Sequence, residues 1–261
     1  MTHPLRWLAL VALDHAEMPS FESLAGWYAE QFPDASPPSH SASTESLLTV
    51  TLGEFTAAIT LVPRPIPWSQ LEGPTATAWY WPQAATMLRD HQAHLLVTLI
   101  DEGGSAVKKA AALTRLTAAA AATMPSAGVF WGPSRMVHAP DAFVDQAIQM
   151  RDDNLPLFLW IDFRIEQFDD GAVRLYTTGL EALGQNEIEV PRFEGHRDGS
   201  SPQELLDFTY NIAHYLLDQT KVIRDGDTIG VTDQVNVTAR REPSMLGGDL
   251  EVLRLEFDRG A

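Results

Sequence analysis

The sequence predicts an α/β fold of the α+β kind, in which mixed or antiparallel sheets pack against helices. In the first half, short apolar segments alternate with helical segments, and in the second half strand-like segments predominate. With 261 residues and 45% hydrophobic content, the chain can bury a sizeable core. We expect one compact body with two lobes: a ferredoxin-like lobe with extra helices at 1–153, and a strand-rich acidic lobe at 154–261.

The first hundred residues predict the order strand, helix, strand, strand, helix, strand, which is that of a ferredoxin-like unit. Gly53 separates the two middle strands as a hairpin, and three prolines between 63 and 67 keep the following chain extended. The last strand is almost wholly apolar, so we expect it at the centre of the sheet. The predicted segments are strands at 5–13, 46–53, 54–62 and 93–100, helices at 20–32 and 84–91, and a loop at 33–43.

An apolar run at 7–13 follows Arg6 near the beginning of the chain. A spanning helix needs about 20 apolar residues, and no small-residue cleavage site follows this run cleanly. We therefore expect a buried first strand rather than a signal peptide, and no interaction with a membrane.

An alanine-rich helix is predicted at 105–124, where Pro125 ends it. The five alanines at 118–122 indicate either low complexity or close packing on a sheet, and we favour packing. Two short strands, at 127–132 and 135–139, follow, and Pro140 begins a helix that extends to 153.

The second half begins with a hairpin across Asp169-Asp170-Gly171. Ser201-Pro202-Gln203-Glu204 is a capping box with proline at the first helical position, and it predicts the start of a helix that ends near 219. The predicted strands are 157–168, 172–178, 187–190, 221–224, 228–232, 234–240 and 250–257, with a polar loop at 191–200.

The composition limits the classes of function. Without cysteine, the chain has no disulfide, thiolate zinc site or cysteine nucleophile, which fits a reducing compartment, and we expect a cytoplasmic protein. The net charge is -17, and residues 141–261 hold 24 acidic against 11 basic side chains. Such a surface repels nucleic acid and anionic lipid and attracts a basic partner, although charge also serves solubility.

Three groups of polar residues are candidates for a site. Glu187 and Glu189 are expected on one strand face, either as paired carboxylates for hydrolysis or, as we favour, as part of a solvated face. His91 and His94 have the spacing of metal ligands on a helix, but a strand beginning at His94 would separate them. Asp225-Gly226-Asp227-Thr228 resembles part of a calcium loop, and a turn explains it more simply.

Aromatic residues concentrate at Trp79, Tyr80 and Trp81, with Trp68 and Trp131 elsewhere. Such residues predominate in cores and in binding hot spots, so they indicate either a core or an exposed recognition patch. Sequence signatures of nucleotide loops, nucleophile elbows and zinc proteases are all missing from the chain, and we expect no enzyme of those classes, no metal and no cofactor.

Several stretches together resemble the uncharacterised bacterial family called domain of unknown function 4261. They are Pro-Ile-Pro-Trp at 65–68, His-x-x-His-Leu-Leu-Val at 91–97, Thr178-Gly179-Leu180 with Glu187-x-Glu189, and Asp225-Gly226-Asp227-Thr228-x-Gly230. The resemblance implies no activity and no catalytic residues, and only by association an accessory or immunity role beside secretion or toxin systems. We expect a module that binds a basic protein, and the alternative is a hydrolase with a carboxylate and histidine site between the two halves.

Overall fold

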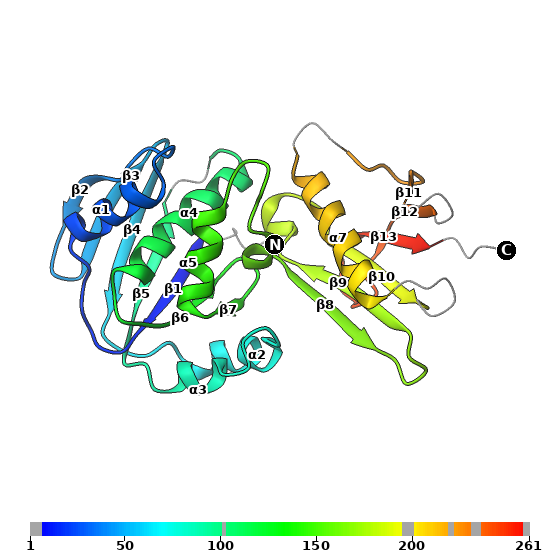
Figure 1. The fold of residues 1–261 in the computed structure, drawn as a ribbon, viewed down its shortest axis with the longest axis horizontal. Helices are drawn as coiled ribbons and strands as arrows, with labels where there is room; N and C mark the ends of the chain where they lie inside the picture. The colour runs from blue at the N-terminus through cyan, green and yellow to red at the C-terminus, as the bar shows by residue number, and fades with distance from the viewer. Residues whose placement is uncertain (1–6, 101–102, 195–200, 219–221, 231–235, 258–261) are drawn as a thin grey trace. The chain divides into compact units, whose positions relative to one another are not determined.

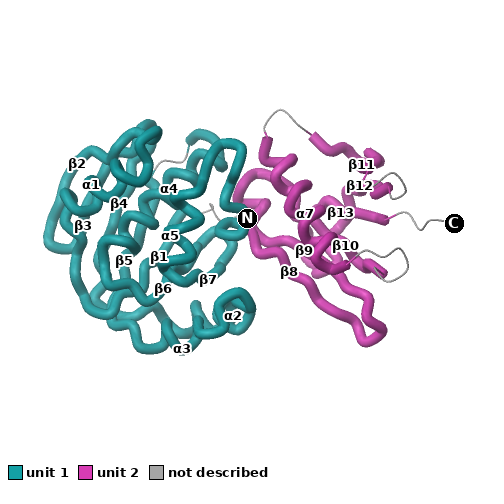
Figure 2. Tube along the Cα trace, in the orientation of Figure 1, with its two compact units in different colours: residues 1–160 teal, residues 161–261 magenta. Residues whose placement is uncertain are grey.

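The computed structural model describes residues 7–100, 103–194, 201–218, 222–230 and 236–257. The chain divides into two compact units, residues 1–160 and residues 161–261 (Figure 2). Leu5, Lys221 and parts of the segments expected at 191–200, 228–232 and 234–240 lie outside the described residues.

Unit 1 is built on a sheet that, over the described residues, has seven antiparallel strands in the order β2-β3-β4-β5-β1-β6-β7 (Figure 1). The strands are β1 Leu8–Leu13, β2 Ser39–Ser43, β3 Leu47–Leu52, β4 Phe55–Val62, β5 Ala93–Leu99, β6 Ser126–Trp131 and β7 Met136–His138. The helices are α1 Phe21–Gln31, α2 Trp68–Thr77, α3 Ala84–Arg89, α4 Ala106–Ala122, α5 Pro140–Gln149 and α6 Leu157–Trp160.

Helices cover both faces of this sheet. Leu10 and Ala12 of β1 pack in a core cluster with residues of α2 and α3, whereas α4 contacts β1, β5 and β6. Alternate residues of a strand point to opposite faces, so β1 is buried on both. The alanines at 118–121 are buried, which confirms that the alanine-rich helix is a packing surface.

The α+β class is confirmed, and the strand order refines the comparison with a ferredoxin-like unit. The predicted series of strands and helices is present, and β5 is central as expected. However, β5 lies between β4 and β1 and pairs antiparallel with both. The first strand therefore pairs with the last strand and with β6, and not with the hairpin.

Unit 2 contains a sheet whose described strands have the order β11-β12-β13-β10-β9-β8, antiparallel except where β10 pairs with β13. Phe208 and Tyr210 of α7 contact Phe257 and Phe163, so the helix packs on the sheet. The elements are β8 Asp162–Gln167, β9 Val173–Thr178, β10 Ile188–Phe193, α7 Pro202–Leu217, β11 Thr228–Gly230, β12 Asn236–Pro243 and β13 Glu251–Phe257. The capping box at Ser201 and Glu204 is present at the start of α7.

Four segments differ from the sequence predictions. Strand β2 lies within the loop that was expected at 33–43. The chain after the three prolines was expected to be extended, but helix α2 begins there, at Trp68. Residues 157–160 form a short helix instead of the start of a strand, because an apolar run of four residues fits either structure. Residues 222–224 are not a strand.

Candidate functional site

Glu187 closes the turn that joins β9 to β10. Its carboxylate accepts hydrogen bonds from Thr177 Oγ1 at 2.7 Å and from the backbone N–H groups of Gly179 and Glu181 at 2.7 and 3.0 Å. Gly179 has φ 124°, a conformation that side chains rarely adopt, so the turn depends on this glycine. Glu187 is 6% exposed and satisfies three donors that would otherwise lie unpaired in the interior.

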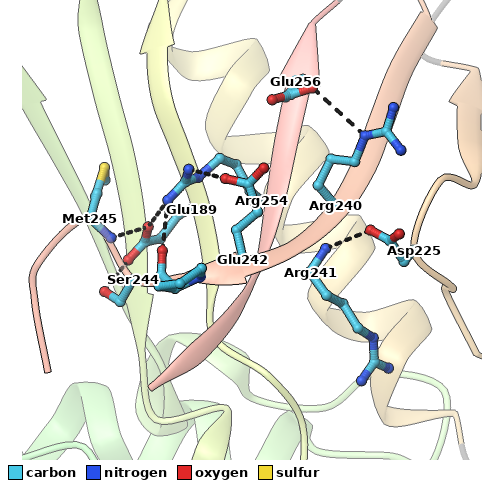
Figure 3. Close-up of polar contacts among 10 residues, drawn as sticks. Glu189, Asp225, Arg240, Arg241, Glu242, Ser244, Met245, Arg254 and Glu256 are labelled. Carbon is cyan, nitrogen blue, oxygen red and sulfur yellow. Dashed lines mark hydrogen bonds and ion pairs between the residues drawn. The ribbon is translucent and has the colours of Figure 1, made fainter. Parts of the chain in front are cut away.

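Glu189 holds a different part of unit 2 (Figure 3). Ser244 Oγ donates to its carboxylate at 2.5 Å, Met245 N–H donates at 2.9 Å, and the Arg254 guanidinium lies 3.6 Å away. Arg254 also pairs with Glu242 on the neighbouring strand. This carboxylate therefore fixes the connection between β12 and β13 onto β10.

The expectation that these two carboxylates belong to a solvated strand face is wrong, because both are buried. Strand β10 lies between β9 and β13, and its first residues are buried on both sides. Glu187 and Glu189 bind separate sets of partners, and each set is internal to unit 2. Their geometry is that of structural acceptors.

Asp225 and Asp227 belong to a turn that packs beside β12. Asp227 accepts from Arg224 N–H at 2.7 Å, and Asp225 accepts from Arg241 N–H at 2.9 Å. Gly226, with φ 83°, donates its N–H to Ala239 O at 2.8 Å. Both carboxylates are thus used by backbone N–H groups, as expected for a turn rather than for a calcium loop.

The two histidines connect the extended proline segment to the sheet. His91 Nε2 accepts from Ile66 N–H at 2.7 Å, and its Nδ1 lies 2.6 Å from Leu88 O. His94 Nδ1 lies 2.8 Å from Arg64 O, and burial lowers the pKa of this imidazole. Both ring nitrogens of His91 contact backbone groups, and so does Nδ1 of His94, so both histidines have a structural role. Within the described ranges, no group of three or more His, Asp or Glu side chains is placed to hold a metal ion.

The aromatic concentration at 79–81 divides between core and surface. Trp81 is 8% exposed and packs in the core of unit 1, whereas Trp79 is 68% and Tyr80 39% exposed. Trp131 is also buried, and Trp68 is half-buried with the Arg89 guanidinium 4.1 Å from its ring centroid. We name Trp79 and Tyr80 the aromatic surface.

Contacts with β7 fix the position of the aromatic surface. Tyr80 donates its hydroxyl to Val137 O at 3.0 Å and stacks on the His138 ring at 5.8 Å. The Trp79 ring meets the Tyr80 ring edge to face at 5.7 Å. Burial lowers the pKa of His138 to about 4, against the effect of a hydrogen bond to the backbone of Leu159, so this imidazole is neutral at pH 7.

A cleft of about 250 Å³ in unit 1 was missed by sequence reasoning. It lies between α1, the beginning of β4, α4 and residues 150–155, and its charged and polar lining includes Tyr28, Lys108, Arg115 and Arg151. The feature of the sequence that could have indicated the cleft is Arg115, a charged residue within an apolar stretch of helix. A second hollow, of about 640 Å³, lies in unit 2 between α7 and β11, and Asp227 is the only predicted site residue on its lining.

Comparison with known families finds a match to part of the chain. Residues 176–256 match the family model described as Domain of unknown function (DUF4261). No curated protein and no solved structure matches the chain. None of the helices in the described residues is long and apolar enough to cross a membrane.

The match lies entirely within unit 2 and extends from β9 to β13. It includes the Glu187 and Glu189 stretch and the turn at 225–230. The Pro-Ile-Pro-Trp stretch and the His-x-x-His stretch lie outside the match, so this family model supports the resemblance in the second half of the chain alone. Over residues 176–256, the chain resembles Domain of unknown function (DUF4261).

Proposed function

We propose that this protein is a protein-binding module that uses the aromatic surface to hold a basic protein partner. The observation that carries the proposal is the exposure of Trp79, at 68% the most exposed of the large hydrophobic side chains described. Tryptophan and tyrosine are the residues most enriched in binding hot spots. An indole that stays exposed on a folded surface does not gain the favourable free energy of burial, and it gains this free energy only when a partner covers it.

The turn that carries Trp79 and Tyr80 is preorganised. Ala78 and Trp81, immediately before and after the pair, are both buried in the core of unit 1. Backbone hydrogen bonds from Trp79 N–H to Thr77 O and from Trp81 N–H to Ala78 O fix the turn at 2.9 Å each. A rigid surface loses little conformational entropy when it binds, so more of the contact energy remains as affinity.

The charge of the chain supports a basic partner. The net charge is -17, and a surface with that sign accelerates encounter with a basic protein and slows encounter with an acidic one. We propose an accessory or immunity type of role, in which the partner is a basic toxin or secreted effector. We place this interaction in the cytoplasm, because a chain that forms no disulfide fits a reducing compartment.

A hydrolase is the weaker alternative. Its acid and base would have to come from carboxylates such as Glu187 and Glu189, and those groups are occupied by internal donors. A carboxylate whose oxygens already accept from internal donors has little freedom to approach a substrate.

Affinity capture with three forms of the full chain tests the proposal. The wild type, Trp79→Ala and the control Ile100→Ala are immobilised and exposed to extracts of the source organism. Ile100 is 56% exposed on unit 1, so the control removes a comparable exposed apolar side chain elsewhere. We expect one basic protein to be retained by the wild type and the control and lost from Trp79→Ala. Equal retention by all three forms, or retention of no protein, would contradict the proposal.

A further inference from the structure

The unit 1 cleft has a cationic rim in a strongly acidic protein. Lys108, Arg115 and Arg151 line it together with two carboxylates, Glu54 and Asp152. Glu54 pairs with Lys108 at 3.3 Å, so the charged lining has one further carboxylate, Asp152, for two arginines. Over its charged lining the cleft is therefore net positive, whereas the whole chain carries -17.

Arg115 is the least exposed of the three cations that line the cleft. It is half-buried, it lowers the pKa of the Tyr28 hydroxyl against the larger effect of burial, and its guanidinium carbon lies 5.9 Å from the Phe32 ring centroid. No carboxylate among the described residues forms an ion pair with it. Removing a guanidinium from water without a counter-ion is unfavourable, so an anion in the cleft would stabilise this arrangement.

Several arginines of unit 2, unlike Arg115 within the described ranges, have a carboxylate partner. Arg164, Arg174, Arg192 and Arg254 each form an ion pair with a carboxylate of their own unit. In the cleft, Arg151 uses its Nη1 atom to donate to the carbonyl oxygens of Ile148 and Met150, and it has no ion pair with a described carboxylate. Two arginines therefore lie on one cleft with guanidinium donors available.

Most of the remaining lining of the cleft is apolar. Leu52, Phe55, Ala112, Met150 and Leu155 line it and are buried. Tyr28 is buried at 2% exposure, and burial raises the pKa of its hydroxyl, which is therefore protonated at neutral pH. The cleft thus combines a cationic rim with an apolar floor in a volume of about 250 Å³, which limits an occupant to a small molecule.

We propose that the unit 1 cleft binds a small organic oxyanion, a carboxylate or phosphate ester with a short apolar body, and that Arg115 anchors its charged group. The planar guanidinium matches the geometry of both carboxylate and phosphate oxygens. The apolar body lies on the floor between α1 and α4. This site is independent of the aromatic surface and of the proposed protein partner.

The test is a titration of the isotope-labelled full chain followed by amide NMR. Phenyl phosphate and phenylacetate serve as the two organic anions, and inorganic phosphate shows whether the apolar body is needed. We expect saturable one-site shifts confined to residues around 107–115 and 150–155 with one or both organic anions. Inorganic phosphate binds at least about tenfold more weakly, and whichever organic anion binds more tightly identifies the charged group.

Arg115→Gln weakens this binding at least about tenfold, because it removes the charge and the bidentate fork. The matched control Arg64→Gln removes an exposed arginine beyond the opposite end of β4, more than about 20 Å along the strand, and leaves the affinity unchanged. Arg151→Gln, at an exposed position, gives a second loss of affinity that does not depend on the folding of the Arg115 variant. No saturable shift with either organic anion, or wild-type affinity in both cleft variants, would overturn the proposal.

Discussion

Glu187 and Glu189 are acidic residues that stabilise backbone in the interior of unit 2. The alternation of acidic and apolar residues at 187–190 is typical of a half-exposed strand, and it correctly predicts a strand here. It gives no information about burial, because the partners of Glu189 are Ser244, Met245 and Arg254, more than fifty residues further along the chain. A local pattern cannot identify partners at that separation.

Replacing Glu187 by alanine should destabilise the chain by about 3 kcal/mol, because three donors in the turn lose their acceptor. Glu256→Ala, at an exposed position on β13, should change the free energy of unfolding by less than about 0.5 kcal/mol. Urea unfolding monitored by circular dichroism measures both variants. Similar midpoints for the two would show that Glu187 is not a structural acceptor.

His138 should make the protein sensitive to acid. Its pKa is lowered by burial to about 4 in the folded chain, against an ordinary value of 6.5. Between these values the unfolded chain binds a proton that the folded chain does not. The contribution of the neutral, buried His138 to the free energy of unfolding is therefore complete above pH 6.5. It decreases as pH falls toward 4, by up to about 1.4 kcal/mol per pH unit.

The variant His138→Gln should lose this part of the pH dependence. Urea unfolding at several pH values between 6.5 and 4 measures the slope for wild type and variant, and other groups contribute equally to both. A variant whose stability falls as steeply as that of the wild type would contradict a neutral buried His138.

At the scale of elements, helices with strong local determinants were predicted well. The capping box sets the start of α7, and the alanine-rich run forms α4. Strand β2 could not be predicted, since its five residues are all exposed and join the sheet by backbone pairing with β3. Nor could the cleft, whose lining comes from segments that only the strand order brings together.

Packing of α3 on β6 depends on Gly128. A Cβ atom there would lie 2.6 Å from Leu88 Cδ2 and 2.9 Å from the Trp81 ring, closer than real contacts. Gly128→Ala should therefore cost about 1–3 kcal/mol through overpacking. Because Trp81 anchors the turn that carries the aromatic surface, the same variant tests the support of that surface.

Gly73→Ala is the matched control for this substitution. Gly73 lies in α2, with no atom within 4 Å of an added Cβ, so alanine should be neutral or stabilising by up to about 1 kcal/mol. Thermal unfolding of both variants measures the difference. A Gly128 variant as stable as the Gly73 variant would show that the contact between α3 and β6 is loose.

For the whole molecule, the sequence predicted the α+β class, because the class follows from composition and from the order of elements. It left open which of the aromatic residues at 79–81 are exposed. Neighbouring residues in a turn can point either way, and only packing on the sheet of unit 1 places Trp81 inside and Trp79 outside. The family match, confined to unit 2, gives no information on the aromatic surface.

Binding kinetics of the captured partner test the central claim most directly. Rate constants are measured for wild type, Trp79→Ala and Ile100→Ala at low and high salt. We expect the association rate of all three forms to fall as salt increases, because the acidic chain attracts a basic partner. We also expect Trp79→Ala alone to dissociate at least about thirtyfold faster, as loss of a hot spot of about 2 kcal/mol requires. A dissociation rate that is the same for Trp79→Ala and Ile100→Ala, or an association rate that ignores salt, would contradict the account.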